Sequence, residues 1–146
     1  MKILVAVDLS EPSEKIVKEA EVIAHSHSAK VWLLHVAEPE PEFLGWSSGP
    51  QVVRDSMSKK FHNEHRSIQG IAERLRKAGL DTTALLVQGA PAETILAEAS
   101  KLGVDMTIVG SHGRGMVYQL LLGSVSEAVL RKSECPILIV PIRKRN

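Results

Sequence analysis

The chain has 146 residues and a formal net charge of +1 at pH 7, which suits one domain with a substantial core. So small a charge gives no electrostatic case for binding nucleic acid or an anionic membrane, and an aromatic fraction of 3% leaves little surface for stacking bases. No signal-peptide pattern and no apolar run of transmembrane length is present. The single cysteine, Cys135, agrees with a reducing compartment. We therefore expect a cytoplasmic protein without nucleic-acid or membrane partners.

Strand and helix patterns alternate along the first half of the chain. Residues 2–8 form a near-continuous apolar run, as in a strand buried on both faces, and 31–36 repeat this pattern. Between these two strands, Ser10 and Pro12 are start signals for a helix. The prolines and glycines of 38–50 predict a mobile loop, which either closes over a ligand or is simply mobile. A long amphipathic helix then runs from Val53 to a stop at Gly79.

The second half continues the alternation and completes the fold. We expect strands over 82–87, 105–109 and 136–140, and helices over 91–102 and 124–132. Five apolar strands separated by helices indicate one parallel sheet covered on both faces, in a single domain. Ligands bind such sheets outside the carboxyl ends of the strands, where the strand order reverses. Asp8 and Gly110 follow two of these strands, and they line one crevice if those strands are neighbours.

The segment from Gly110 to Ser124 is the most informative part of the chain. It carries glycines at 110, 113 and 123 between an apolar run and a helical pattern. In that context backbone N–H groups can gather around a phosphate, and Ser124 adds a hydroxyl at the positive end of a helix. An alternative needs no ligand, because Ser124 and Glu127 also fit a capping box.

The spacing Gly110-x2-Gly113-x9-Gly123-Ser124 resembles the ATP-binding signature of the universal stress protein family. The opening strand with its aspartate and the closing run 136–140 are also similar to that family, so the resemblance covers the whole chain, 1–146. It implies a Rossmann-like fold, similar to the adenine nucleotide alpha hydrolases, with strand order 3-2-1-4-5. It also implies the ATP-binding branch and a homodimer formed through 136–142.

The resemblance assigns roles to individual residues. Asp8 and the backbone of Val36 correspond to adenine contacts, and Gly110 corresponds to the ribose contact. Ala6 stands where some binders carry proline. The phosphate positions match Gly113, Gly123, Ser124 and Val125. The whole predicted nucleotide site comprises Ala6, Asp8, Val36, Val109, Gly110, Ser111, Gly113, Arg114, Gly123, Ser124 and Val125.

The chemistry of these residues supports part of the assignment. A carboxylate can accept a hydrogen bond from the adenine amino group but not from a guanine carbonyl, so Asp8 favours adenine. The alternative for Asp8 is a carboxylate stabilised at a helix N-terminus. Arg114 is suited to pair with phosphate oxygens or to remain solvated, and His112 is a weaker candidate. His62 and His65 have helical spacing, but without an evident third metal ligand they indicate a solvated helix face.

No enzyme is evident in the sequence. The Walker Gly-Lys-Ser/Thr motif is absent, and with it the usual lysine for phosphate transfer. We expect an ATP-binding stress-response protein whose nucleotide, with Mg2+ or Mn2+ held by the phosphates, modulates contacts with protein partners. The alternative is a slow ATPase or phosphotransfer protein. A receiver-like signalling domain is disfavoured, because Asp8 has no acidic neighbour and the third strand ends without a phosphoacceptor aspartate.

Overall fold

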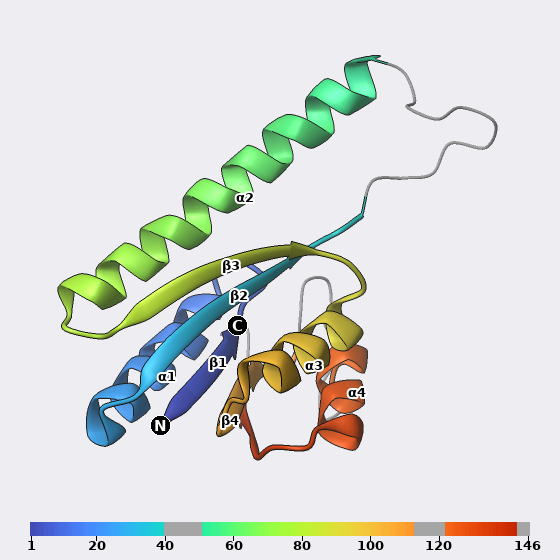
Figure 1. Cartoon of the computed structure of the whole chain (residues 1–146). Helices are drawn as coiled ribbons and strands as arrows, with labels where there is room; N and C mark the ends of the chain where they lie inside the picture. Colours follow the sequence, from blue (N-terminus) through green and yellow to red (C-terminus); the bar gives the residue numbers. More distant parts are fainter. Residues whose placement is uncertain (40–50, 113–121, 143–146) are drawn as a thin grey trace.

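The computed structural model describes residues 1–39, 51–112 and 122–142. A five-stranded parallel sheet with strand order β3-β2-β1-β4-β5 forms its centre (Figure 1). This confirms the expected fold class and strand order. The elements are β1 (Lys2–Ala6), α1 (Ser13–His27), β2 (Lys30–Ala37), α2 (Gln51–Lys77), β3 (Thr82–Gln88), α3 (Pro91–Leu102), β4 (Met106–Gly110), α4 (Ser124–Lys132) and β5 (Ile137–Val140).

Helices cover the sheet on both faces, because successive strand residues point to opposite sides. Ile3 and Val5 of β1 pack with α1 and α2 in one buried cluster. Leu4 between them packs with α3 and α4 in a second cluster. The continuous apolar runs of the strands are thus explained by burial on two sides.

β1 and β4 lie side by side, with Ile3 paired to Met106 and Val5 to Ile108. The chain leaves β1 toward β2 on one side, whereas β4 lies on the other, so the strand order reverses between them. This adjacency brings the carboxyl ends of β1 and β4 together, as the sequence predicted.

The helix boundaries follow local backbone chemistry. α3 begins with Pro91 in its first turn and ends at Gly103, whose φ of 59° is left-handed. α1 ends at Ser28, also left-handed with a φ of 47°. α4 departs from expectation, because its N-cap is Gly123 rather than Ser124.

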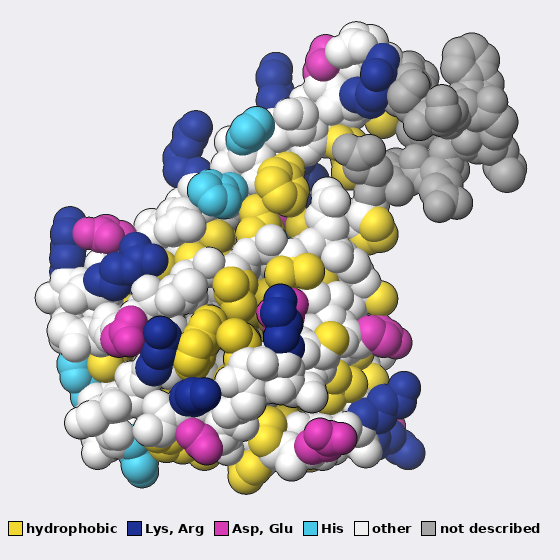
Figure 2. All heavy atoms as spheres, in the orientation of Figure 1, with side chains coloured by type: hydrophobic (Ala, Val, Ile, Leu, Met, Phe, Trp, Pro, Cys, Tyr) yellow, Lys and Arg dark blue, Asp and Glu magenta, His cyan; other side chains and the backbone are white. Residues whose placement is uncertain are grey.

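α2 has 27 residues, and its buried side chains are Ile68, Ala72 and Leu75, all in its last ten residues. The predicted apolar face toward the N-terminus is only half-buried at Val53, and Val52 is 79% exposed. Apolar side chains follow α2 along the face shown in Figure 2, among charged side chains of both signs. The first half of α2 is therefore an arm with little core beneath it.

The expected loop 38–50 falls largely on residues 40–50, outside the described residues.

An ion pair joins α1 to α2 away from the sheet. The Arg74 guanidinium donates two hydrogen bonds to the Glu14 carboxylate, at 2.9 and 2.8 Å. The hydrogen bond from Arg74 lowers the pKa of Glu14 below its ordinary value and raises that of Arg74. Because the two side chains are 57% and 41% exposed, we expect the pair to stabilise the fold by at most about 1 kcal/mol.

Within the described part of the chain, no helix combines the length and apolar character needed to cross a bilayer.

Candidate functional site

A cavity of about 310 Å³ opens at the carboxyl edge of the sheet, around the point where the strand order reverses. Cavities of this size at such switch points are common small-molecule sites. The predicted site residues that line it are Ala6, Asp8, Val36, Val109, Gly110, Gly123, Ser124 and Val125. Ser111 lies beside the cavity wall, and Gly113 and Arg114 fall outside the described residues.

The N-terminus of α4 forms one end of the cavity. Gly123 is the N-cap, with extended backbone (φ −60°, ψ 154°), and as a glycine it has no side chain with which to cap the helix. Glu127 does not reach back to the helix start but accepts hydrogen bonds from Arg131, one turn later, at 3.0 and 2.7 Å. The capping-box alternative is therefore wrong. The first N–H groups of a helix have no intrahelical acceptor, so this end of α4 can donate to an anion.

Hydrogen bonds hold the two sides of this anion end together. The Gly123 N–H donates to the Ser111 carbonyl at 2.8 Å. The buried Ser126 hydroxyl donates to the carbonyl of Gly110. These contacts fix the start of α4 against the end of β4, while the Ser124 side chain stays exposed at the cavity.

His112 adds a polar atom to the same end. Its Nε2 is buried and has no hydrogen-bond partner among the described residues. Its Nδ1 lies 3.0 Å from the Ser111 hydroxyl, which itself accepts from the Ile142 N–H at 2.9 Å. When Ser111 donates to Nδ1, Nε2 carries the ring hydrogen and can donate to an anionic ligand. The sequence analysis gave His112 as a weaker candidate, since the burial of Nε2 is a tertiary feature that spacing does not show.

Asp8 lies two residues beyond β1 and also lines the cavity. Its Oδ1 accepts from both the backbone N–H, at 2.9 Å, and the hydroxyl of Ser10. These bonds hold a tight turn in which Leu9 has a left-handed φ of 62°. Asp8 therefore shapes the turn before α1 rather than capping the helix. The described contacts use Oδ1 alone, which leaves Oδ2 available for a ligand.

A buried polar pair that the sequence analysis missed also lines this cavity. His35 of β2 is 7% exposed, and its Nε2 lies 3.1 Å from Oε2 of Glu64 on α2. Its Nδ1 lies 2.9 Å from the carbonyl oxygen of Val7. A histidine inside an apolar strand run requires buried partners. That requirement was the available signal, although the sequence does not say which residue of α2 meets it.

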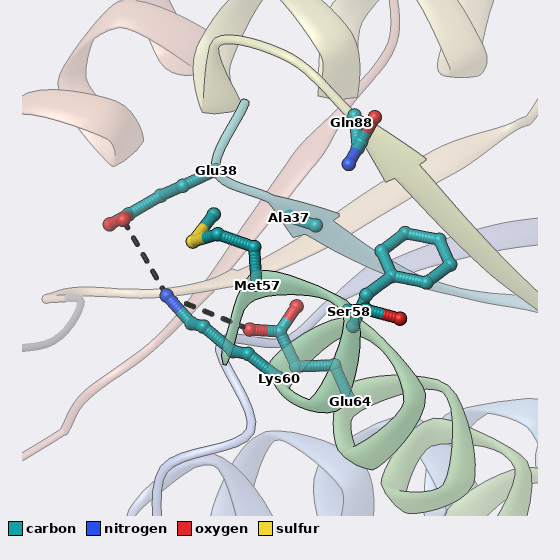
Figure 3. A pocket seen from close by; sticks show the side chains of 8 residues that line it. Ala37, Glu38, Met57, Ser58, Lys60, Glu64 and Gln88 are labelled. Atoms are coloured by element: carbon teal, nitrogen blue, oxygen red, sulfur yellow. Dashed lines mark ion pairs between the residues drawn. The ribbon is translucent and has the colours of Figure 1, made fainter. Parts of the chain in front are cut away.

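Lys60 extends the polar group toward the end of β2. Its Nζ lies 3.9 Å from Oε1 of Glu64 and 3.6 Å from Oε2 of Glu38. Figure 3 shows Lys60 between the two carboxylates, at a neighbouring hollow of about 300 Å³ that Met57 also lines. His62 and His65, in contrast, are exposed on α2. No group of three or more potential metal ligands occurs in the part of the chain that the structure describes.

Comparison with known proteins identifies the family. The model of the universal stress protein family matches residues 1–141. The chain belongs to the universal stress protein family. A universal stress protein of Thermus aquaticus is 31% identical over 140 residues, covering 94% of this chain and 96% of that protein. The family resemblance predicted from the glycine spacing and the two terminal strands is thereby confirmed.

Solved structures of the family share the whole fold. The structure of MJ0577 is 32% identical, with a TM-score of 0.82, and covers 99% of this chain and 97% of its own. The sequence of that universal stress protein, from Methanocaldococcus jannaschii, is 31% identical over 152 residues, covering 95% of this chain and 93% of its own. A universal stress protein solved in complex with cAMP, 24% identical with a TM-score of 0.73, covers 98% of each chain. That last likeness establishes the common fold.

Proposed function

We propose that this chain binds an adenine nucleotide, preferentially ATP, in the cavity between β1 and β4. The observation that carries the proposal is the N-terminus of α4, whose N-cap Gly123 has no capping side chain and which lines the same cavity as Asp8. The cavity thus offers hydrogen-bond donors and a positive helix dipole at α4, and an acceptor at Asp8. A molecule with a phosphate at one end and an amino-bearing base at the other matches this polarity.

The phosphates are expected at the α4 end. Backbone N–H groups of the first helical turn, the Ser124 hydroxyl and the His112 ring lie there. Gly110 also lines the cavity, and by the family resemblance it is the ribose contact. Gly113 and Arg114 are further phosphate contacts by the family resemblance.

The base is expected between Asp8 and Val36. Oδ2 of Asp8 can accept from the adenine amino group, and the Val36 backbone can bond a ring edge. Guanine presents a carbonyl where adenine has its amino group, and a carbonyl repels a carboxylate. The described residues show no metal cluster of their own, so Mg2+ or Mn2+ would be held by the phosphates.

The biological output we propose is signalling rather than chemistry. Nucleotide occupancy would change how the protein meets partners, with two copies paired through β5. Ile137, Leu138 and Ile139 of that strand are partly exposed, and β5 pairs with β4 at the end of the sheet order. An apolar edge strand favours pairing with another chain. The alternative, slow ATP hydrolysis or phosphotransfer, uses the same site.

Substitution of Gly123 by valine tests the site. The extended backbone at Gly123 accepts valine, so the fold should persist while the added methyl groups occupy phosphate space. Isothermal titration calorimetry should show ATP binding by the wild type and no measurable binding by Gly123→Val. Gly70→Ala, on the exposed side of α2 with nothing within 4 Å of the added Cβ, is the control and should bind normally. Normal affinity in Gly123→Val would contradict the site assignment.

A further inference from the structure

The His35 ring is placed between two hydrogen-bond acceptors. The carbonyl of Val7 lies 2.9 Å from Nδ1, and the carboxylate of Glu64 lies 3.1 Å from Nε2. A carbonyl oxygen can only accept, so Nδ1 must carry a hydrogen. The neutral ring has a single N–H, which leaves the Nε2 lone pair facing the carboxylate oxygen. A second proton is needed between Nε2 and Oε2.

Burial makes the missing proton costly. The side chains of His35 and Glu64 are 9% and 12% exposed, so water does not readily replace either partner. An ionised Glu64 facing an unprotonated Nε2 would bury two opposed lone pairs. With a proton on the pair, one hydrogen bond satisfies both atoms.

Further charged groups lie around the pair. Lys60 approaches the other oxygen of Glu64 at 3.9 Å and Glu38 at 3.6 Å. With one proton shared between His35 and Glu64, these four side chains carry no net charge, whereas a neutral ring beside an ionised Glu64 leaves them with one net negative charge. The charged or titratable groups that also line the cavity are Asp8, at the end of β1, and His112, after β4.

The position of the pair connects it to the base end of the cavity. Val7, which accepts from Nδ1, immediately precedes Asp8. His35 itself immediately precedes Val36 in β2. The ring therefore ties together the two strand ends that carry the proposed base contacts, and Glu64 anchors the ring to α2.

We propose that His35 and Glu64 are positioning residues that hold one shared proton and fix the base end of the nucleotide cavity. The proposal rests on the proposed nucleotide binding and assigns a role to residues outside the predicted contacts. The ring holds Val7 and Val36 in place, and the proton on the pair keeps the ring in place. Loss of the Glu64 partner frees the ring and loosens the base contacts, while the phosphate end around Gly123 is unaffected.

Binding to separate parts of the ligand tests this role. Affinities would be measured for adenosine, inorganic tripolyphosphate and ATP. The proteins are the wild type and four single variants: Glu64→Ala, Glu64→Gln, His35→Asn and His35→Gln. Gln at 64 can donate to a neutral Nε2 and needs no extra proton, so it should bind adenosine within about twofold of the wild type. Glu64→Ala should lose on the order of tenfold, the effect of one buried charge-assisted hydrogen bond.

The two His35 variants separate the two bonds of the ring. Asn places its amide nitrogen near the position of Nδ1 and retains the bond to Val7. Gln places its amide nitrogen near the position of Nε2 and retains the bond to Glu64. Both variants should weaken adenosine binding, because the proposed role of the ring requires its bonds to both Val7 and Glu64. Tripolyphosphate affinity should change by less than about twofold in every variant.

Two results overturn the positioning role. Unchanged adenosine affinity in Glu64→Ala is one, and equal loss of adenosine and tripolyphosphate affinity is the other, because it indicates general disruption. A wild type that binds no adenosine or ATP refutes the proposed function instead. Nuclear magnetic resonance of the ligand-free wild type tests the proton separately, through the ring nitrogens of His35 and the carboxyl carbon of Glu64. A neutral ring beside an ionised carboxylate would overturn the shared proton.

Discussion

Replacing Gly110 by alanine should destabilise the fold, because the added Cβ would meet closely packed neighbours at the end of β4. A Cβ at this position would lie 2.9 Å from Cδ1 of Ile16, 3.0 Å from Cγ1 of Ile142 and 3.3 Å from the carbonyl oxygen of His112. Ordinary Cβ contacts begin at about 3.4 Å. The two isoleucine side chains can rotate away, but the backbone oxygen moves only with the chain.

The magnitude follows from these overlaps. Inserting one methyl group into a packed site costs about 1–3 kcal/mol, and two of the three contacts are side-chain atoms that can yield. We therefore expect Gly110→Ala to lower the free energy of unfolding by about 1–2 kcal/mol. For a chain of this size that corresponds to a fall in Tm of about 3–6 °C. ATP affinity should fall as well, because the shifted His112 backbone leads into the phosphate end.

Gly70→Ala is the matched control for this measurement. Gly70 lies inside α2, and an added Cβ there meets nothing within 4 Å. Alanine in a helix interior is favoured over glycine by about 0.5–1 kcal/mol, so this variant should be more stable than the wild type. Urea titrations followed by circular dichroism measure both changes. A Gly110→Ala variant as stable as the wild type would refute the packing argument.

Three further predictions concern the ligand and the surface. Asp8→Ala should weaken ATP binding and reduce the preference over GTP, and an unchanged ATP/GTP affinity ratio would show that Asp8 does not select the base. Turnover should be on the order of one ATP per minute or less, far below the roughly 1–100 per second of kinases, because the sequence lacks the Walker lysine and the proposed phosphate contacts neutralise charge already present in the ground state. Phosphate release above one per second that Gly123→Val abolishes would make the protein an enzyme. Glu14→Gln should lower the unfolding free energy by about 0.5–1 kcal/mol at neutral pH. Since the fold lowers the pKa of Glu14, that difference should begin to shrink as the pH falls below about 4.5 and vanish once the pH is below the lowered pKa of the folded state, and a difference that persists in strong acid would contradict it.

The parallel sheet was predictable because each strand carries a continuous apolar run and each helix a separate stripe, whereas the strand order followed from the family resemblance. The exact ends of the helices were harder to predict from the sequence. Ser124 and Glu127 fit a capping box by spacing alone, yet the helix begins after Gly123 and Glu127 bonds Arg131 instead. Sequence spacing is compatible with both arrangements. The tertiary contact from Gly123 to Ser111 distinguishes them.

The candidate site was predicted in part for the same reason. Residues such as Asp8 and Gly123 fall next to strand or helix ends, so topology alone brings them to one cavity. His35 and Glu64 do not, because their contact depends on how α2 is rotated and how far it slides along the sheet. Side-chain periodicity gives the buried face of a helix but does not fix its register against β2.

The arm formed by the first half of α2 has a consequence for hydrogen exchange. A helix of 27 residues is about 40 Å long, but its fully buried side chains begin only at Ile68. Isolated helical segments of fewer than about 12–15 residues are marginal in water. The amides of the first turns should therefore exchange through local fraying, whereas those near Leu75 exchange only when the domain unfolds. Glu64 lies between the part of α2 that frays locally and the part that opens only with the domain. Its bond to His35 should therefore limit local fraying to the residues before it.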